Sequence, residues 1–255
     1  MKMRITTILL AIGFVAQAQL KPISYSDGNQ KLEGLLASPS KINTQKSGVL
    51  ILPAWMGIET NARENAVNLA KLGYITFVAD IYGVDKRPAN AKEAGQLAGY
   101  FKTNYADYQK RIQLALDQLI KAGANPDKIA IIGYCFGGSG AIEAARANFK
   151  VNGVVSFHGG LSREASRTIE PIKPKVLVLH GADDFYISEA EIKAFQDEMR
   201  TAKADWQMVY YADAVHAFTH KDAGSDKSKG TAYNEKAAKR SWQAMLDFFK
   251  EIFAE

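Results

Sequence analysis

The chain has 255 residues, of which 47% are hydrophobic and 10% aromatic, so it can bury a full core as one domain. Its formal net charge of +5 is mild, and its 32 Lys and Arg residues are spread along the chain, which argues against a nucleic-acid-binding protein. The presence of one cysteine excludes a disulfide bond within the chain.

The first 18 residues have the pattern of a secretory signal peptide. Lys2 and Arg4 precede an apolar run over residues 5–15, and a small-residue site, Ala-Gln-Ala, follows at residues 16–18. The apolar run is shorter than the roughly 20 residues that a membrane span needs. We therefore expect an exported protein, periplasmic or secreted, with residues 19–255 forming one domain and no membrane anchor once the leader is removed.

After the leader, short aliphatic runs alternate with longer helical patterns. This alternation predicts an α/β fold, with a mostly parallel twisted sheet flanked by helices on both faces. Residues 31–36 predict an early edge strand belonging to a leading hairpin. Six buried strands are predicted over residues 48–52, 74–78, 129–133, 151–157, 175–179 and 207–211.

Between these strands, apolar residues recur at helical spacing. The stripes occupy positions 62, 66, 69 and 70; positions 108, 112, 115, 116 and 119; and, near the C-terminus, positions 242, 245, 246, 249 and 253. Such stripes predict helices packed on a core rather than a cofactor-binding segment.

The single cysteine, Cys135, lies in GYCFGGSG, between a predicted strand and a predicted helix. Strand, sharp turn and helix around G-x-C-x-G form the pattern of a nucleophile elbow, with cysteine where serine often stands. Gly133 and Gly137 leave room for the strand and the helix to approach. The helix N-terminus favours the thiolate by about 0.3 to 2 kcal/mol. From an ordinary pKa of about 8.5, that leaves much of the thiol protonated at neutral pH, so a base is needed.

A base and an acid are predicted in loops that follow later strands, at the carboxyl edge of the sheet where sites of this architecture collect. The strand over residues 175–179 leads into Asp183 and Asp184, and the strand over residues 207–211 leads into His216. Cys135, Asp184 and His216 therefore follow one another in the order and in the loops that a catalytic triad requires.

Three other histidines are weaker candidates. His180 ends a strand and is expected to be a packed core residue. His158 lies in FHGGL, which is similar to an oxyanion motif but follows the nucleophile, so we expect it in the pocket wall or in a structural role. His220 and His216 lack a third ligand at metal-binding spacing. The phosphate-binding and dinucleotide-binding glycine motifs are missing as well, so no metal and no cofactor are predicted.

Three motifs, GYCFGG, HGADDFYI and DAVHAF, give the chain a resemblance to the dienelactone hydrolase family of α/β-hydrolases, from about residue 48 to the last helix. The resemblance implies that Cys135 is the nucleophile, His216 the base and Asp184 the acid, with Asp183 as the second choice for the acid. It also implies an oxyanion hole made of the backbone N–H groups of Phe136 and Trp55.

The chain departs from the family pattern at the substrate side. The family's glutamate beside the oxyanion residue corresponds to Ala54, so the state of the thiol is expected to depend more directly on His216. The two arginines that hold the family substrate's carboxylate correspond to Val84 and His220. This argues against dienelactone itself as the substrate, although Arg87 lies close enough in sequence to replace one of them.

These observations together predict a hydrolase of a small ester or lactone, acting through a Cys-His-Asp triad and a thioester acyl-enzyme. Tyr134, Met56, Arg87 and His158 are predicted to line the substrate pocket. The sequence alone leaves other hypotheses open: a redox-sensing thiol or a ligand-binding protein on the same fold, a peptidase or acyltransferase, and an inactive domain whose cysteine is buried and inert.

Overall fold

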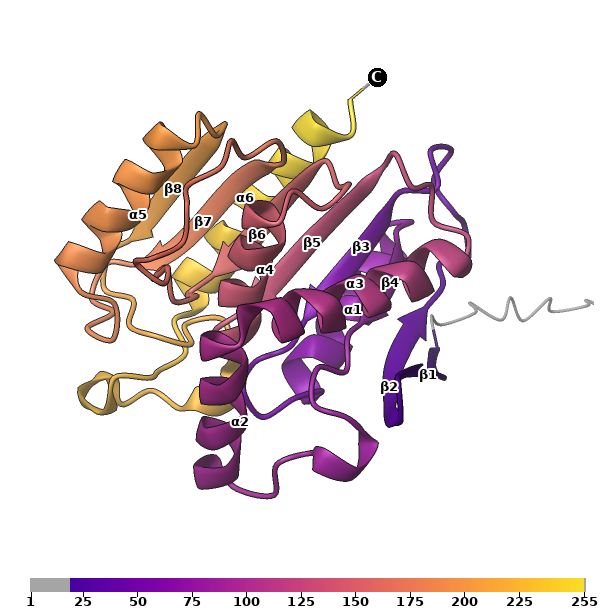
Figure 1. The fold of residues 1–255 in the computed structure, drawn as a ribbon, viewed down its shortest axis with the longest axis horizontal. Coiled ribbons are helices and arrows are strands. Elements are labelled where there is room, and N and C mark those ends of the chain that lie inside the picture. The colour runs from indigo at the N-terminus through magenta and orange to yellow at the C-terminus, as the bar shows by residue number, and fades with distance from the viewer. Residues whose placement is uncertain (1–18, 255) are drawn as a thin grey trace, which may run out of the picture.

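The computed structural model describes residues 19–254, so the predicted signal peptide lies outside the described residues. Within that range the chain forms one eight-stranded sheet with helices on both faces (Figure 1), as predicted. Between residues 19 and 254, no helix combines the length and the apolar character needed to cross a bilayer.

The spatial order of the strands is β1-β2-β4-β3-β5-β6-β7-β8. The strands are β1 Leu20–Asp27, β2 Gln30–Ala37, β3 Gly48–Leu52, β4 Ile75–Val78, β5 Ile129–Tyr134, β6 Gly153–Phe157, β7 Lys175–Gly181 and β8 Trp206–Tyr211. The helices are α1 Thr60–Lys71, α2 Ala91–Thr103, α3 Tyr105–Lys121, α4 Phe136–Arg146, α5 Glu189–Thr201 and α6 Glu235–Ile252, with short 3-10 turns at Val84–Lys86, Lys221–Ala223 and Lys227–Lys229.

The first two strands form the predicted hairpin, but the edge strand is β1 and not the segment over residues 31–36. That segment is part of β2, which pairs antiparallel with β1 on one side and with β4 on the other. The strands from β3 to β8 pair in parallel. β1 is hard to recognise in the sequence because it is only partly covered, and its exposed positions hold Lys21, Pro22, Ser24 and Ser26.

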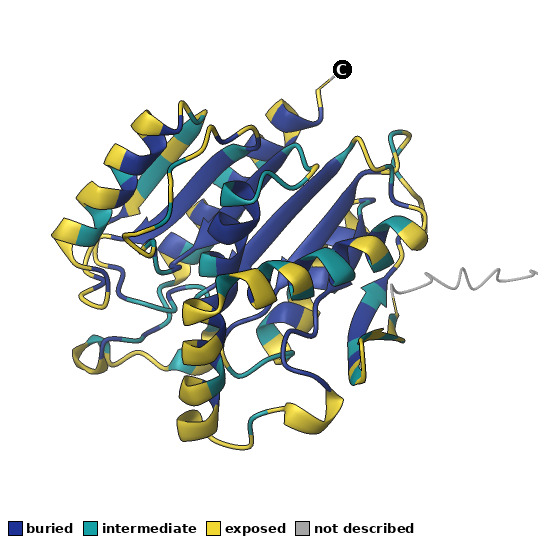
Figure 2. Ribbon diagram, viewed as in Figure 1, coloured by how far each residue is buried: buried dark blue, intermediate teal, exposed yellow. Residues whose placement is uncertain are grey.

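Two hydrophobic clusters lie on the two faces of the sheet. One cluster packs the sheet against α3, α4 and α5, with Phe101 of α2, and the other packs it against α1 and α6. Because successive strand residues point to opposite faces, Ile131 belongs to the first cluster and Ile132 to the second. Figure 2 shows the central strands buried throughout, whereas β1 and β8 at the two edges are only partly buried, and most helices are buried mainly on the side that meets the sheet. Full burial of one such side chain stabilises the fold by about 1.5–3 kcal/mol.

The parallel strands end at one edge of the sheet, which is where ligands bind in folds of this type. The segments that follow β5, β7 and β8 carry Cys135, Asp184 and His216. The topology therefore brings together three residues that lie far apart in the sequence.

Candidate active site

Cys135 forms a sharp turn between β5 and α4. Its backbone has φ 53° and ψ −113°, a conformation that costs a residue with a Cβ atom about 1–3 kcal/mol. The turn is held on both sides, since the Cys135 N–H donates to Phe157 O at 3.0 Å and the Ser139 N–H donates to Cys135 O at 3.1 Å. The side chain is partly exposed and stands at the N-terminus of α4, where the helix dipole favours a negative charge.

The glycines on either side of the turn are required by contact distances. A Cβ atom on Gly133 would lie 1.8 Å from Gly137 O, and one on Gly137 would lie 2.1 Å from Leu52 O. Both neighbours are backbone atoms, so neither can move aside without shifting the strand or the helix. The close packing of β3, β5 and α4 thus fixes the position of the sulfur.

Asp184 and His216 form a buried pair beside this turn. His216 Nδ1 lies 2.8 Å from Asp184 Oδ2, and the Asp184 side chain is fully buried. The Tyr186 N–H donates to the second carboxylate oxygen, Oδ1, at 3.1 Å. Asp183 is exposed, and its N–H donates to Ala214 O at 3.0 Å, so Asp184 is the carboxylate that orients the imidazole.

The thiol of Cys135 and the imidazole of His216 are close enough that each shifts the pKa of the other. Burial acts to raise the pKa of Cys135, but the hydrogen bond and positive charge of His216, with the Phe136 N–H, lower it overall. Burial acts to lower the pKa of His216, but Asp184 and Cys135 outweigh it and raise the pKa to about 10. Each of the two groups therefore favours the charged form of the other.

The two amides predicted for the oxyanion hole lie in neighbouring segments. Phe136 is the first residue of α4, and its ring lies between those of Tyr82 and Tyr108, at centroid distances of 5.7 and 4.6 Å. Trp55 follows β3, and its carbonyl accepts a hydrogen bond from Tyr82 Oη at 2.8 Å. Ala54 and Phe136 line the same small void, so the two segments are adjacent.

The other three histidines, His158, His180 and His220, lie outside the Cys135–His216–Asp184 group. His158 is fully buried, with its ring 5.2 Å from that of His216 and its Nε2 2.8 Å from Thr219 Oγ1. Burial, together with the charge of His216, holds the pKa of His158 well below its usual value, so its ring is neutral. His220 packs 5.4 Å from His158. His180 is buried at the end of β7 against Tyr210, as expected for a core histidine.

The residues predicted for the substrate pocket lie in different places. His158 packs directly on His216, and Met56 is half-buried in the turn after β3. Arg87 is exposed and lies 3.4 Å from Glu33 and 3.8 Å from Asp80. Tyr134 lies on the α1–α6 face, stacked on Phe157 at 4.7 Å, where it lines a separate cavity.

Two tyrosines that the sequence did not single out lie near the triad. Tyr82 fixes the Trp55 carbonyl and stacks on Phe136. Tyr186 is half-exposed, and its ring lies 5.5 Å from that of His216. Both follow parallel strands at the carboxyl edge, which is the positional signal that could have identified them.

Across residues 19–254, no three His, Cys, Asp or Glu side chains are grouped so that they could hold a metal ion. The arrangement of Cys135, His216 and Asp184 is instead suited to nucleophilic chemistry with proton transfer.

Comparison with known proteins places this chain in a family. The sequence profile described as "Dienelactone hydrolase family" matches residues 32–253. A curated relative, a putative carboxymethylenebutenolidase from Yersinia pestis, is 24% identical over 89% of this chain and 85% of its own length.

Solved structures agree with the profile. A dienelactone hydrolase-like promiscuous phosphotriesterase from metagenomic libraries is 35% identical, with a TM-score of 0.87, and covers 94% of this chain and 100% of its own. A putative dienelactone hydrolase from Klebsiella pneumoniae shares the fold at 22% identity, with a TM-score of 0.75 over 91% of this chain and 98% of its own. The predicted α/β-hydrolase fold is thereby confirmed.

Proposed function

The chain belongs to the dienelactone hydrolase family and is a carboxylic ester or lactone hydrolase, and we propose that it acts through Cys135, His216 and Asp184 with a thioester acyl-enzyme. One observation carries the proposal. The only thiol of the chain stands at a strained turn at the start of a helix, beside an imidazole that lowers its pKa and whose Nδ1 lies 2.8 Å from a buried carboxylate.

In the first step the Cys135 thiolate attacks the carbonyl carbon of the ester. A carbon–sulfur bond forms, and the carbonyl π electrons move to the oxygen. The N–H groups of Phe136 and Trp55 donate hydrogen bonds to this oxyanion; removing one such donor in other enzymes slows the reaction by about a hundred- to a thousand-fold.

In the second step the carbon–oxygen bond to the leaving alcohol breaks. The His216 imidazolium gives its proton to the departing oxygen, which leaves a thioester on Cys135 and a neutral imidazole. Asp184 holds the Nδ1–H of that imidazole, so the opposite nitrogen is free to accept a proton. In a lactone, the released alcohol stays attached to the acyl group.

Hydrolysis of the thioester reverses the proton transfers. Neutral His216 takes a proton from water, the resulting hydroxide attacks the thioester carbon, and the thiolate departs as the acid product forms. The thiolate–imidazolium pair is then restored. No cofactor enters this cycle.

The experiment that tests the proposal compares wild-type protein with Cys135→Ala on p-nitrophenyl acetate. Turnover is expected to be lost in the variant while its circular dichroism spectrum stays unchanged. His180→Gln, at a buried histidine outside the triad, serves as the matched control and is expected to keep activity if it folds. Turnover by Cys135→Ala at the wild-type rate would refute the proposal.

A second candidate activity is hydrolysis of an aryl dialkyl phosphate triester. It is favoured by the 35% identity, over 94% of this chain, with a promiscuous phosphotriesterase. In this reaction the Cys135 sulfur would bond to phosphorus as the aryloxide leaves. Incubation with such a triester and mass analysis of the Cys135 peptide tests this, and an unmodified peptide with no aryloxide released would exclude it.

A further inference from the structure

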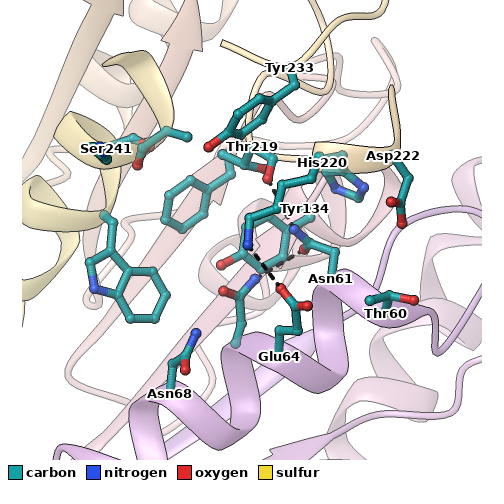
Figure 3. Close-up of a pocket in the computed structure, with 16 residues that line it drawn as sticks. Thr60, Asn61, Glu64, Asn68, Tyr134, Thr219, His220, Asp222, Tyr233 and Ser241 are labelled. Atoms are coloured by element: carbon teal, nitrogen blue, oxygen red, sulfur yellow. Dashed lines mark hydrogen bonds and ion pairs between the residues drawn. The ribbon is translucent and has the colours of Figure 1, made fainter. Parts of the chain in front are cut away.

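A cavity of about 390 Å³ lies on the α1–α6 face of the sheet, and none of the three triad residues lines it. Its walls come from residues 60–68 of α1, the ends of β5 and β6, the loop after His216 and the start of α6 (Figure 3). The volume is within the roughly 300–1,000 Å³ that is usual for small-molecule sites. We call this cavity the α1–α6 pocket and define it by Asn61, Asn65, Tyr134, His220, Lys221 and Trp242.

Two side chains of the α1–α6 pocket each carry a buried polar atom without a hydrogen-bond partner among residues 19–254. These atoms are Tyr134 Oη and His220 Nε2, and the Tyr134 side chain is only 1% exposed. Buried polar groups are nearly always hydrogen-bonded, because leaving them unpaired is destabilising. Both atoms have almost no accessible surface, so they mark unmet hydrogen bonds inside the wall of the pocket, which a bound molecule would complete once these side chains turn toward it.

Both atoms belong to groups that are uncharged at neutral pH. Burial raises the pKa of Tyr134, so its hydroxyl stays protonated. Burial, with the nearby charge of His216, lowers the pKa of His220 to about 4. A neutral imidazole and a phenol can each donate and accept hydrogen bonds, which matches the hydroxyl group of a ligand better than a charged group.

The wall formed by α1 is lined with amides. Asn61, Asn65 and Asn68 share one face of the helix, at spacings of four and three residues. Asn61 Nδ2 donates to Thr219 O at 3.2 Å, and Asn65 Nδ2 donates to Asn61 Oδ1 at 3.1 Å (Figure 3). Each amide carries donors and acceptors, so the wall offers both to a ligand.

The charges around the pocket balance. Two acidic residues, Glu64 and Asp222, and two basic residues, Lys221 and Lys239, line it, and Lys221 Nζ lies 3.5 Å from Glu64 Oε2 at the exposed rim. Trp242, half-buried on α6, adds an aromatic face. A lining of amides, neutral hydrogen-bonding groups and an indole, with no net charge, favours a ligand that has several hydroxyls and one apolar face.

We propose that the α1–α6 pocket binds a neutral polyhydroxylated molecule of monosaccharide size, at a site separate from the ester hydrolysed at Cys135. The ligand's hydroxyls bond to the Asn61 and Asn65 amides, to Tyr134 Oη and to His220 Nε2. Its apolar face packs on Trp242. The binding does not depend on the chemistry of the thiol.

The test adds a sugar stepwise to the folded protein and monitors the backbone amide signals by NMR. Three sugars of similar shape and different charge are compared: neutral D-glucose, anionic D-glucuronate and cationic D-glucosamine. We expect saturable shifts for D-glucose at amides of α1 and the start of α6, and weaker binding of the anionic and cationic probes. Cys135→Ala should bind D-glucose as the wild type does, so a failed hydrolase assignment would leave this result untouched.

Variants locate the site. Asn65→Ala and Tyr134→Phe are each expected to weaken D-glucose binding about 2- to 10-fold, the effect of one neutral hydrogen bond. Gln243→Ala is the matched control, since it removes an exposed amide from α6 outside the pocket. The proposal is overturned by any of three results: no saturable shift with D-glucose, equal or tighter binding of either charged probe, or unchanged affinity in both pocket variants.

Discussion

Replacing Asp184 with Asn tests how the imidazole of His216 is held. The Asp184 side chain is fully buried and its Oδ2 lies 2.8 Å from His216 Nδ1. The substitution keeps the shape and removes the negative charge. Two effects follow: His216 loses a charge-assisted hydrogen bond, and the carboxylate that raises its pKa disappears.

The magnitude follows from the geometry. A hydrogen bond to a charged group contributes about 1.5–3 kcal/mol, and each 1.36 kcal/mol is tenfold in rate. Asp184→Asn should therefore lower kcat/KM by about ten- to 150-fold. If the Asn amide donates to Nδ1, the imidazole is held in the wrong tautomer and the loss can reach about ten-thousand-fold.

The assay is the pH dependence of kcat/KM on p-nitrophenyl acetate. The pKa of His216 is raised to about 10, so in the wild type the imidazolium persists up to that pH and activity falls above it. Without the Asp184 carboxylate that pKa drops, and the alkaline limb should move to lower pH. Asp183→Asn, at the exposed neighbouring carboxylate, should match the wild type. The reasoning is wrong if both variants behave alike.

Three further predictions concern the turn, the thiol and the leader. Gly137→Ala should destabilise the fold by about 1–3 kcal/mol in urea unfolding, because its Cβ would lie 2.1 Å from a backbone oxygen, whereas Gly99→Ala, at an open position on α2, should be neutral or stabilising. His216→Gln should shift alkylation of Cys135 by iodoacetamide to higher pH, since the imidazolium lowers that pKa; an unshifted profile would contradict the pairing. After expression in an exporting host, the protein should begin at Gln19, and an intact mass that includes residues 1–18 would count against the signal peptide.

Much of the fold could be predicted because its central strands are buried on both faces. Each of the six predicted buried strands overlaps an observed strand, with ends shifted by at most two residues, as at residues 151–157, where β6 begins at Gly153. The leading hairpin was less clear. β1 lies at the sheet edge with part of its surface in water, so its sequence mixes polar and apolar residues and gave no sign that it, rather than β2, is the outer strand.

The part of the site that lies within one short segment, the turn at Cys135, could be predicted from the sequence. Gly133 and Gly137 around Cys135 indicate a turn with no room for a Cβ atom, and the contacts bear this out. The face of the sheet to which a side chain points was not predicted for Tyr134. Tyr134 points to the same face as Ile132, and counting two residues along β5 would have placed it on the α1–α6 side.

Other features of the site depend on contacts between distant segments. The choice of Asp184 over Asp183 rests on which of two adjacent carboxylates faces the loop after β8. The burial of His158 against His216 depends on β6 and that same loop meeting, and its positive φ of 39° has no sequence signal.

The most direct measurement of the central claim is the ultraviolet absorbance of the thiolate as a function of pH. Cys135 is the only cysteine, so the difference between the wild type and Cys135→Ala reports on that sulfur alone. We expect a thiolate signal at neutral pH, with a midpoint below the ordinary thiol pKa of about 8.5. A midpoint at or above that value would show that His216 does not hold the sulfur as a thiolate, and would contradict the proposed mechanism.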